Sequence, residues 1–249
     1  MDTTTPKDPI IFVHGAWHGK WCWEKFFRQP FEVAGHEVIS FDLPGHGQPG
    51  KIKGINQYGI RDYTRALEQE VAKLDRPPIL IAHSMGGLVA QKFLEKNSCK
   101  KVVLLAPVPP HGVIWTTLRF ARKSYFYPSV LGMNLYKLVD TAAKSRAAFF
   151  SEDMPQEEVK TYADQMCSES FKAFIGMLFP FIKVNYHRQV PMLVLGAELD
   201  TIFTPKDNQK TAQKYGADLH TFPQMAHDMM LEKDHALVAS HILQWLETS

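Results

Sequence analysis

A serine with small neighbours follows an apolar segment in the first half of the chain. Residues 79–83 are Ile-Leu-Ile-Ala-His, Ser84 comes next, and residues 88–94 have helical character. A sharp turn from a strand into a helix presents a serine hydroxyl as a nucleophile, and it requires small residues two positions before and after the serine. Ala82 and Gly86 meet this requirement. Because serine also caps helices, a nucleophilic role for Ser84 depends on other groups in the chain.

A second segment has the features of a site that stabilises negative charge. Residues 12–17, Phe-Val-His-Gly-Ala-Trp, end the first apolar run. Acyl-transfer enzymes with a serine at such a turn place a backbone amide here, beside the amide that follows the serine. Ala16 and Met85 are therefore the predicted oxyanion donors. Gly15 is predicted to let the substrate approach the backbone.

A nucleophilic serine needs a general base and an acid that orients the base. His227 follows the last apolar run of the chain, and Asp200 follows the run before it. The order serine, acid, histidine fits this type of nucleophile. His227 would take the Ser84 proton and return it to the leaving group, while Asp200 fixes the tautomer of the imidazole. Glu198 is an alternative acid, but Asp200 is preferred because Pro205 soon follows it and opens a helix.

The chain has 11 histidines, so position must separate their roles. His14 is expected to shape the turn after the first strand, His83 the turn at the serine, and His18 is a candidate pocket residue. The sequence contains no HExxH motif, and the histidines lack carboxylate or thiolate partners at metal-ligand spacing. Residues 45–47, Gly-His-Gly, continue into a loop instead of a helix, which disfavours a dinucleotide site. No metal and no other cofactor is predicted.

Short apolar runs alternate with longer helical periods, which predicts βα units and a parallel sheet. Six strands are expected, each rich in Val, Ile, Leu or Phe, at residues 9–14, 37–42, 78–83, 101–106, 191–196 and 218–222. Apolar residues at helical spacing predict covering helices at 61–74 and near the C-terminal end, with an apolar face formed there by Val238, Ile242 and either Trp245 or Leu246.

About seventy residues between two expected strands are too many for an ordinary connection. We therefore expect a core formed by residues 1–107 and 190–249 and a helical cap formed by residues 108–189. Pro and Gly positions divide the cap into predicted helices at 118–127, 135–149, 156–166 and 170–178.

Aromatic and aliphatic side chains of the cap are candidates for the roof of a pocket. The set is Phe171, Phe174, Met177, Leu178, Phe179 and Phe181. Phe174 and Leu178 are predicted to bind substrate, although an apolar stripe of this kind also fits the cap's own core. Trp17 is predicted to line the pocket. The alternative is that Trp17 and Trp21 only pack against the first helix. Arg119, Arg122 and Lys123 are interpreted as a solvated helix face.

The mixed charges of the chain give a net charge of only +2, which favours neither nucleic acid nor an acidic membrane as partner. Three widely spaced cysteines, Cys22, Cys99 and Cys167, suggest a reducing compartment, so a cytoplasmic location is expected. The start lacks a signal-peptide pattern, and no apolar stretch reaches the length of about 20 residues that spans a bilayer. We expect a small-molecule partner and no membrane, and leave the oligomeric state open.

Four segments together resemble the α/β-hydrolase superfamily: HGAWHGKWCW at 14–23, FDLPGHG at 41–47, IAHSMGGLVAQ at 81–91 and AHDMML at 226–231. The first is similar to the branch of plant methylesterases and hydroxynitrile lyases, and the chain is expected to be a bacterial relative. The resemblance implies a six-stranded α/β-hydrolase fold with a helical cap. The lyases typically have threonine at the position of Gly15 and lysine after the catalytic histidine, where this chain has Asp228.

These departures favour hydrolysis of a carboxylic ester through an acyl-enzyme over lyase chemistry. Thioester or lactone hydrolysis by the same groups remains a close alternative. A cofactor-independent oxygenase on the same fold and a hydrolase-like receptor for a small molecule also remain, because a fold alone does not settle a function.

Overall fold

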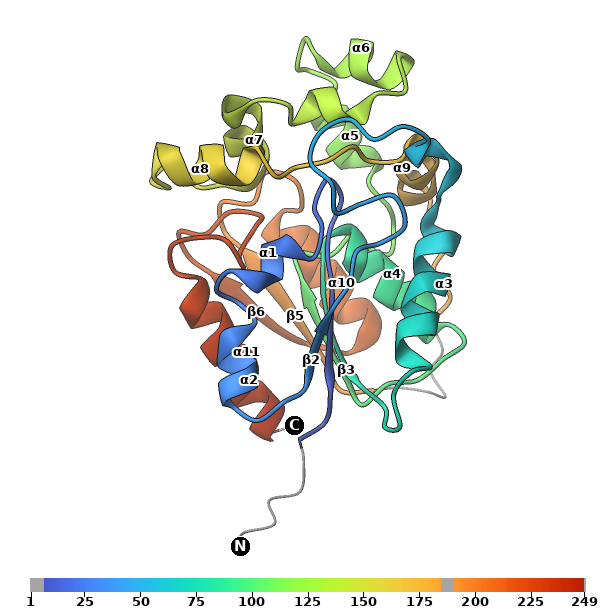
Figure 1. Cartoon of the computed structure of the whole chain (residues 1–249), viewed down its shortest axis with the longest axis vertical. Coiled ribbons are helices and arrows are strands. Elements are labelled where there is room, and N and C mark those ends of the chain that lie inside the picture. Colours follow the sequence, from blue (N-terminus) through green and yellow to red (C-terminus); the bar gives the residue numbers. More distant parts are fainter. Residues whose placement is uncertain (1–6, 185–189, 249) are drawn as a thin grey trace, which may run out of the picture.

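One parallel sheet of six strands organises the part of the chain that the structure describes (Figure 1). The computed structural model describes residues 7–184 and 190–248. The strand order is β2-β1-β3-β4-β5-β6, and every neighbouring pair is parallel. The strands are β1 (Ile10–Val13), β2 (Val38–Ser40), β3 (Ile79–His83), β4 (Lys101–Leu105), β5 (Met192–Ala197) and β6 (Asp218–Phe222). The predicted six-stranded parallel sheet is confirmed, with most ends one or two residues shorter.

Helices cover both faces of the sheet, which explains the apolar composition of its strands. The core helices are α1 (Trp21–Glu24), α2 (Gln29–Val33), α3 (Ile60–Val71), α4 (Met85–Leu94), α10 (Pro205–Tyr215) and α11 (His235–Thr248), and η1 (Ile55–Gln57) is a 3-10 turn. α2 packs with α11 on one face, and α3 with α4 on the other (Figure 1). Every residue of β1, β3, β4 and β5 is buried, as expected for strands covered on both sides.

A helical cap lies over the carboxyl ends of the strands (Figure 1). It contains α5 (Ile114–Phe120), α6 (Phe126–Leu131), the 3-10 turn η2 (Leu135–Leu138), α7 (Ala142–Phe149), α8 (Gln156–Ala163) and α9 (Phe171–Leu178). The predicted end of the cap falls on residues 185–189, which lie outside the described residues. The expectation that the start lacks a signal peptide concerns in part residues 1–6, which also lie outside them. None of the described helices is both long and apolar enough to span a membrane.

Two predicted cap helices were wrong, and a side-chain cap accounts for the break in the second of them along the chain. The helix predicted at 135–149 is split into η2 and α7, since Thr141 is extended and its side chain accepts a hydrogen bond from the Lys144 amide at 3.3 Å. The helix predicted at 118–127 is replaced by α5 and α6. Pro128, expected to separate helices, lies within the first turn of α6, where the missing amide removes no helical hydrogen bond.

The first turn of α4 packs closely against the end of β1. A Cβ atom added to Gly86 would lie 2.4 Å from the Val13 oxygen and 2.5 Å from the His14 oxygen. Both oxygens belong to the backbone, so they cannot move aside as a flexible side chain can. The small residue required at this position by the sequence pattern is therefore required by the contact between the helix and the strand.

We predict that Gly86→Ala lowers the free energy of unfolding by about 3 kcal/mol, because overpacking against backbone forces the sheet and helix apart. Gly176→Ala in α9 is the matched control. Its Cβ would meet only the Ile60 side chain, at 3.1 Å, and alanine favours the helix, so a change below about 1 kcal/mol is expected. Urea unfolding of both variants measures the difference, and equal stability of the two would contradict the prediction.

Candidate active site

Ser84 occupies a strained turn between β3 and α4. Its backbone has φ 52° and ψ −117°, a conformation that residues with a side chain rarely adopt. The neighbouring chain holds it there: the Ser84 amide donates to the Leu105 oxygen at 3.0 Å, and the Ser84 oxygen accepts from the Val108 amide at 3.0 Å. The side chain contributes to the wall of a cavity beneath the cap. The turn therefore presents the hydroxyl to that cavity.

His227 and Asp200 meet in the loops that follow β6 and β5. The His227 Nδ1 atom lies 2.8 Å from Asp200 Oδ2, and both side chains are buried. The other Asp200 oxygen accepts hydrogen bonds from the backbone amides of Ile202 at 2.7 Å and Phe203 at 2.9 Å. A carboxylate held in this way keeps a proton on Nδ1 of the imidazole and leaves Nε2 as the basic nitrogen. Glu198, the alternative acid, is exposed to solvent.

Two aromatic rings connect His227 with the cavity that contains Ser84. The Phe203 and Phe149 rings lie 5.5 and 6.0 Å from the imidazole of His227, measured between centroids, and both line the cavity. The His83 ring, adjacent in sequence to the serine, lies 4.7 Å from the same imidazole. The structure thus brings the predicted serine, histidine and aspartate to one edge of the sheet and one side of the cavity.

The two predicted oxyanion amides belong to the first residue of α4 and the loop after β1. The amide of Met85 has no acceptor within its helix, because the first turn lacks preceding carbonyls. Ala16 lines the cavity with Ser84. His14 Nδ1 donates to the Gly15 oxygen at 2.8 Å, which fixes the peptide group that carries the Ala16 amide.

The protonation state of His14 follows from its other nitrogen. His14 Nε2 accepts a hydrogen bond from the Leu43 amide at 3.0 Å, which requires a neutral ring. Burial, with a smaller effect from the neighbouring His46, lowers the pKa of His14 well below its ordinary value. His14 therefore shapes this turn as a neutral ring whose two nitrogens form hydrogen bonds with two different loops.

His18 and Asp228 form a buried ion pair behind the oxyanion loop. His18 Nδ1 lies 2.7 Å from the Ala16 oxygen, and its Nε2 lies 2.9 Å from Asp228 Oδ2. Two acceptors require two ring protons, so His18 is an imidazolium. Burial alone would lower the pKa of His18, but the Asp228 carboxylate and the Ala16 carbonyl outweigh it and the pKa is raised. The pair links the oxyanion loop to the residue after His227.

The second Asp228 oxygen faces the turn that contains the serine. Asp228 Oδ1 lies 3.6 Å from His83 Nε2 and has no hydrogen-bond partner among the described residues. His83 Nε2 donates to the His227 backbone oxygen at 3.1 Å. Burial, followed by the nearby His227 and His18, lowers the pKa of His83 well below its ordinary value. Asp228, which belongs to the His227 loop, thus contacts the oxyanion loop through His18 and lies beside the serine turn at His83.

His83, His227 and Asp228 also satisfy a geometric criterion for a metal site, because one potential ligand atom from each lies within 4.8 Å of the others. His83 Nε2 is engaged by the His227 carbonyl, and His227 Nδ1 is engaged by Asp200. These hydrogen bonds account for the cluster as a polar network, and the sequence-based expectation of no metal stays a prediction.

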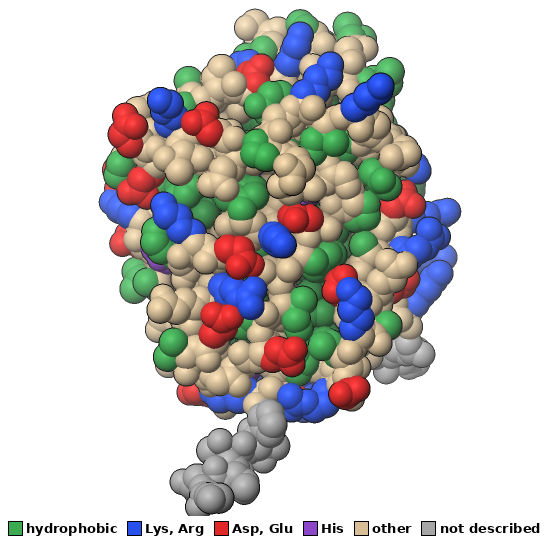
Figure 2. All heavy atoms as spheres, viewed as in Figure 1, with side chains coloured by type: hydrophobic (Ala, Val, Ile, Leu, Met, Phe, Trp, Pro, Cys, Tyr) green, Lys and Arg blue, Asp and Glu red, His purple; other side chains and the backbone are tan. Residues whose placement is uncertain are grey.

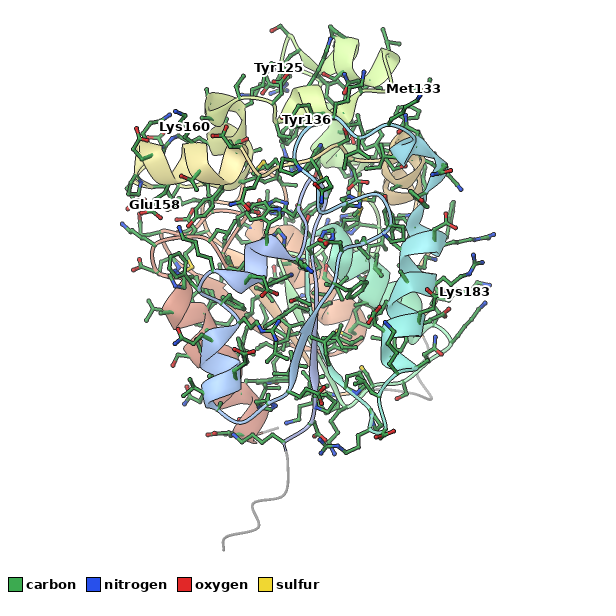
Figure 3. All side chains as sticks on the ribbon, viewed as in Figure 1. Tyr125, Met133, Tyr136, Glu158, Lys160 and Lys183 are labelled. Atoms are coloured by element: carbon green, nitrogen blue, oxygen red, sulfur yellow. The ribbon has the colours of Figure 1, made fainter. Side chains whose placement is uncertain are left out.

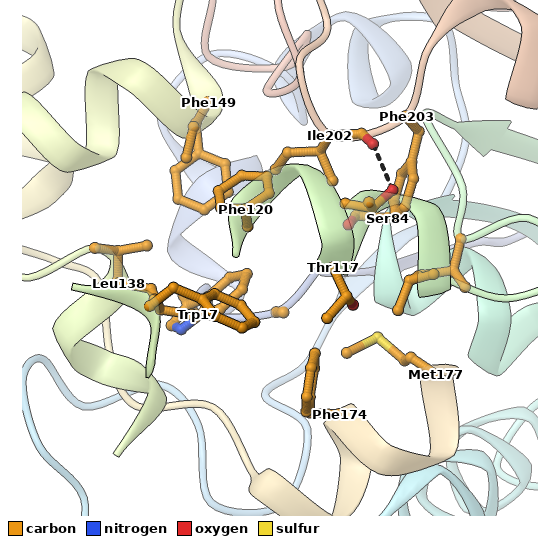
Figure 4. A pocket seen from close by; sticks show the side chains of 17 residues that line it. Trp17, Ser84, Thr117, Phe120, Leu138, Phe149, Phe174, Met177, Ile202 and Phe203 are labelled. Carbon is orange, nitrogen blue, oxygen red and sulfur yellow. Dashed lines mark hydrogen bonds between the residues drawn. The ribbon is translucent and has the colours of Figure 1, made fainter. Parts of the chain in front are cut away.

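The cavity beneath the cap encloses about 670 Å³, its mouth included, and is almost wholly apolar (Figure 4). No charged side chain of the described residues lines it; the lining residues are Ala16, Trp17, Ser84, Val108, Val113, Thr116, Thr117, Phe120, Phe126, Leu138, Val139, Ala148, Phe149, Phe174, Met177, Ile202 and Phe203.

Two of the five predicted substrate-binding residues, Trp17 and Phe174, line the cavity, and Gly15, His18 and Leu178 do not. Gly15 instead packs against the serine turn, because a Cβ atom there would lie 3.0 Å from Ser84 Cβ. His18 is held in its ion pair.

Several cavity residues had no signal in the sequence. Phe149 and Phe203 contact both the cavity and His227, but nothing in their spacing distinguishes them from ordinary core residues. Thr117 lines the cavity, and its hydroxyl has no hydrogen-bond partner among the described residues. The pairing of His18 with Asp228 joins residues 210 positions apart, and only the histidine was singled out as a candidate.

We predict that Asp228→Asn lowers the free energy of unfolding by about 3 kcal/mol near neutral pH, because it leaves a buried imidazolium without its counter-ion. The pKa of His18 is higher in the folded state than in the unfolded state. The ion pair therefore adds its full contribution to the free energy of unfolding below the unfolded-state pKa. That contribution is lost as the pH rises through the folded-state pKa. The difference from wild type should therefore narrow at alkaline pH.

Asp153→Asn is the matched control for that measurement, because Asp153 pairs with Lys233 on the exposed surface. Urea unfolding across a pH series should show little change for this variant. Equal losses for the buried and exposed aspartates would contradict the proposed importance of the buried pair.

Comparison with known proteins gives partial matches to curated esterases. The chain is 37% identical over 109 residues to a carbendazim hydrolyzing esterase of Nocardioides sp., covering 41% of this chain and 43% of that protein. It is 36% identical over 128 residues to methylesterase 3 of Arabidopsis thaliana, covering 48% of each. These alignments span less than half the length of the curated relatives. They confirm the resemblance to the plant methylesterase branch.

Solved structures share the fold over nearly the whole chain. A methylesterase from Arabidopsis has a TM-score of 0.67 at 20% identity and covers 98% of this chain and 100% of its own. An esterase from Exiguobacterium antarcticum has a TM-score of 0.71 at 16% identity, covering 97% and 92%. The alpha/beta hydrolase family matches residues 10–240. The chain therefore belongs to the alpha/beta hydrolase family.

Proposed function

We propose that this protein is a serine esterase that hydrolyses a carboxylic ester of a small apolar molecule through an acyl-enzyme. The observation that carries the proposal is the buried His227–Asp200 pair at 2.8 Å beside a cavity that also holds Ser84 in a strained turn. The esterases among the relatives support it, although the matched segments are partial.

In the proposed reaction, Ser84 Oγ attacks the ester carbonyl carbon while His227 Nε2 takes its proton. The carbonyl oxygen becomes negative and is stabilised by the amides of Ala16 and Met85. When the bond to the alcohol oxygen breaks, His227 returns the proton to that oxygen and the acyl group stays on Ser84. A water molecule then repeats the sequence and releases the acid. Asp200 stabilises the imidazolium at each step.

The cavity supports a neutral, apolar substrate. A charged group would lose its hydration without gaining a counter-ion, because no charged side chain of the described residues lines the cavity. The free hydroxyl of Thr117 can form one hydrogen bond with a substrate oxygen. A free carboxylate fits poorly, which also disfavours a receptor for an organic acid. Thioesters and lactones of similar polarity fit the same groups.

The lyase alternative is disfavoured by the surroundings of Gly15. A side chain at this position would meet His83 Nδ1 at 2.8 Å and Ser84 Cβ at 3.0 Å, so the threonine typical of the lyases does not fit without displacing His83. The carboxylate of Asp228, where those enzymes have a lysine, is already engaged by His18.

The three cysteines support the proposed cytoplasmic location. Cys22, Cys99 and Cys167 are all buried and free. Burial raises the pKa of each thiol, to about 12 for Cys99 and Cys167, which keeps them protonated and unreactive.

Ser84→Ala should reduce hydrolysis of a short p-nitrophenyl ester by about 10³-fold or more, because no other group supplies the nucleophile. It should also block labelling by a fluorophosphonate probe. Ser98→Ala, at an exposed site, is the control and should retain both properties. Wild-type labelling of the Ser84→Ala variant would refute the assignment. A panel of neutral and carboxylate-bearing esters, thioesters and lactones then tests the expected preference for neutral apolar substrates.

Asp200→Asn should reduce kcat on the order of 10³-fold, because the amide no longer stabilises the required tautomer and charge of His227. Glu198→Gln should stay within about twofold of wild type, since this exposed carboxylate lies outside the cavity wall. Steady-state kinetics of the two variants provide the comparison. A larger loss in Glu198→Gln would reassign the acid.

A further inference from the structure

The cap exposes several large apolar side chains. Its helices α5 and α6 lie toward the end of the molecule away from the termini (Figure 1), and the exposed Met133 is labelled there in Figure 3. Among the described residues, five of the thirteen exposed large apolar side chains fall within residues 115–133. We call these five residues the cap tip: Trp115, Leu118, Tyr127, Leu131 and Met133. Trp115 is 65% exposed and Leu131 is 82% exposed. Clusters of this kind mark surfaces that contact something other than water.

The helices of the cap tip are apolar on their inner sides too. From α5, Thr116, Thr117 and Phe120 line the cavity, and Phe126 does so from α6. A helix that separates a cavity from water should be polar on its outer side. α5 and α6 therefore form a wall one helix thick, with an apolar cavity on one side and apolar side chains exposed on the other.

The charged side chains of the cap-tip segment are all basic, and Asp140, which directly follows this segment, is already paired with Lys144. Residues 108–139 contain Arg119, Arg122, Lys123 and Lys137 and no aspartate or glutamate. Arg122 and Lys123 are exposed and form no ion pair among the described residues. Lys and Arg side chains lie among hydrophobic ones at this end of the molecule, where Figure 2 also shows an acidic side chain beside a basic one. The surface combines apolar anchors with uncompensated positive charge.

We propose that the cap tip docks on an anionic lipid surface, with its apolar side chains inserted among the lipids and Arg122 and Lys123 near the headgroups. This combination of Trp and Leu with basic residues is typical of peripheral membrane contacts. The proposal revises the expectation of no membrane partner and the interpretation of Arg119, Arg122 and Lys123 as a merely solvated face. It requires no membrane-spanning helix.

Charge favours lipid over a second copy of the chain as the occupant. A symmetric dimer places the same patch on both sides of the interface. Arg122 and Lys123 would then face their own copies, and residues 108–139 supply no carboxylate to pair with them. An anionic bilayer complements both the charge and the apolar character of the patch. Docking would also bring an apolar molecule dissolved in the bilayer next to the wall of the cavity.

Vesicle co-sedimentation tests the proposal directly. Wild-type protein should bind vesicles of phosphatidylcholine with phosphatidylglycerol more tightly than vesicles of phosphatidylcholine alone, and the preference should weaken with added salt. Trp115→Ser combined with Leu131→Ser should weaken binding at least tenfold. Arg122→Gln combined with Lys123→Gln should remove the preference for the anionic vesicles.

Val33→Ser combined with Leu237→Ser is the matched control, because these side chains are 80% and 60% exposed on core helices α2 and α11. This variant should bind vesicles like wild type. Equal weakening in both apolar variants, or no binding by wild type, would overturn the proposal. The proposal would also be overturned if sedimentation velocity showed a concentration-dependent dimer of the wild-type protein and the Trp115→Ser, Leu131→Ser variant were monomeric.

The vesicle test is independent of the proposed esterase activity. With a water-soluble short ester and no vesicles, the cap-tip variants should hydrolyse at the wild-type rate, because none of the substituted side chains lines the cavity. Loss of vesicle binding with unchanged hydrolysis supports docking. Vesicle binding by a protein that cleaves no ester would refute the esterase and leave the docking surface intact.

Discussion

The ion pair between His18 and Asp228 joins parts of the chain that must be registered to within a fraction of an ångström. One partner holds the carbonyl of Ala16, and the other follows His227 in sequence and faces His83 beside the serine turn. Replacing both partners of such a pair with apolar groups would change stability little, because the attraction only offsets the loss of hydration, whereas removing one partner leaves a buried charge and is costly. The main effect of the pair is on geometry, because it fixes the position of the oxyanion loop relative to the loop that carries the predicted base.

Other hydrogen bonds fix the predicted catalytic groups within their own loops. The Asp200 carboxylate is fixed by two backbone amides, and the neutral ring of His14 fixes the peptide before Ala16. These bonds join groups of the protein to one another and use no substrate atom. Preorganised donors of this kind stabilise developing charge without rearrangement. The cap contributes shape and low polarity, and the loops of the core contribute the chemistry.

Local patterns in the sequence predicted the sheet and the three residues of the proposed catalytic group. Ser84, His227 and Asp200 could be found because each follows an apolar strand whose end is visible in the sequence. Gly15 was also noticed for a sound reason, but its close neighbour is the serine turn and not the substrate cavity. The helix boundaries of the cap were harder to predict. Thr141 and Pro128 affect them through side-chain and backbone geometry, which the spacing of apolar residues does not reveal. Phe149 and Phe203 become cavity residues only through tertiary packing.

The order of strands in the sheet has a consequence for synthesis of the chain. From β4 onward, each strand pairs with the one made just before it, so the sheet grows at one edge as the polypeptide leaves the ribosome. Ser84 is set early, against β4, whereas Asp200 and His227 follow the last two strands. The predicted nucleophile turn therefore forms in a nascent chain before the predicted acid and base have been made. In the proposed mechanism, ester cleavage begins only after the last loop has packed His227 against His83.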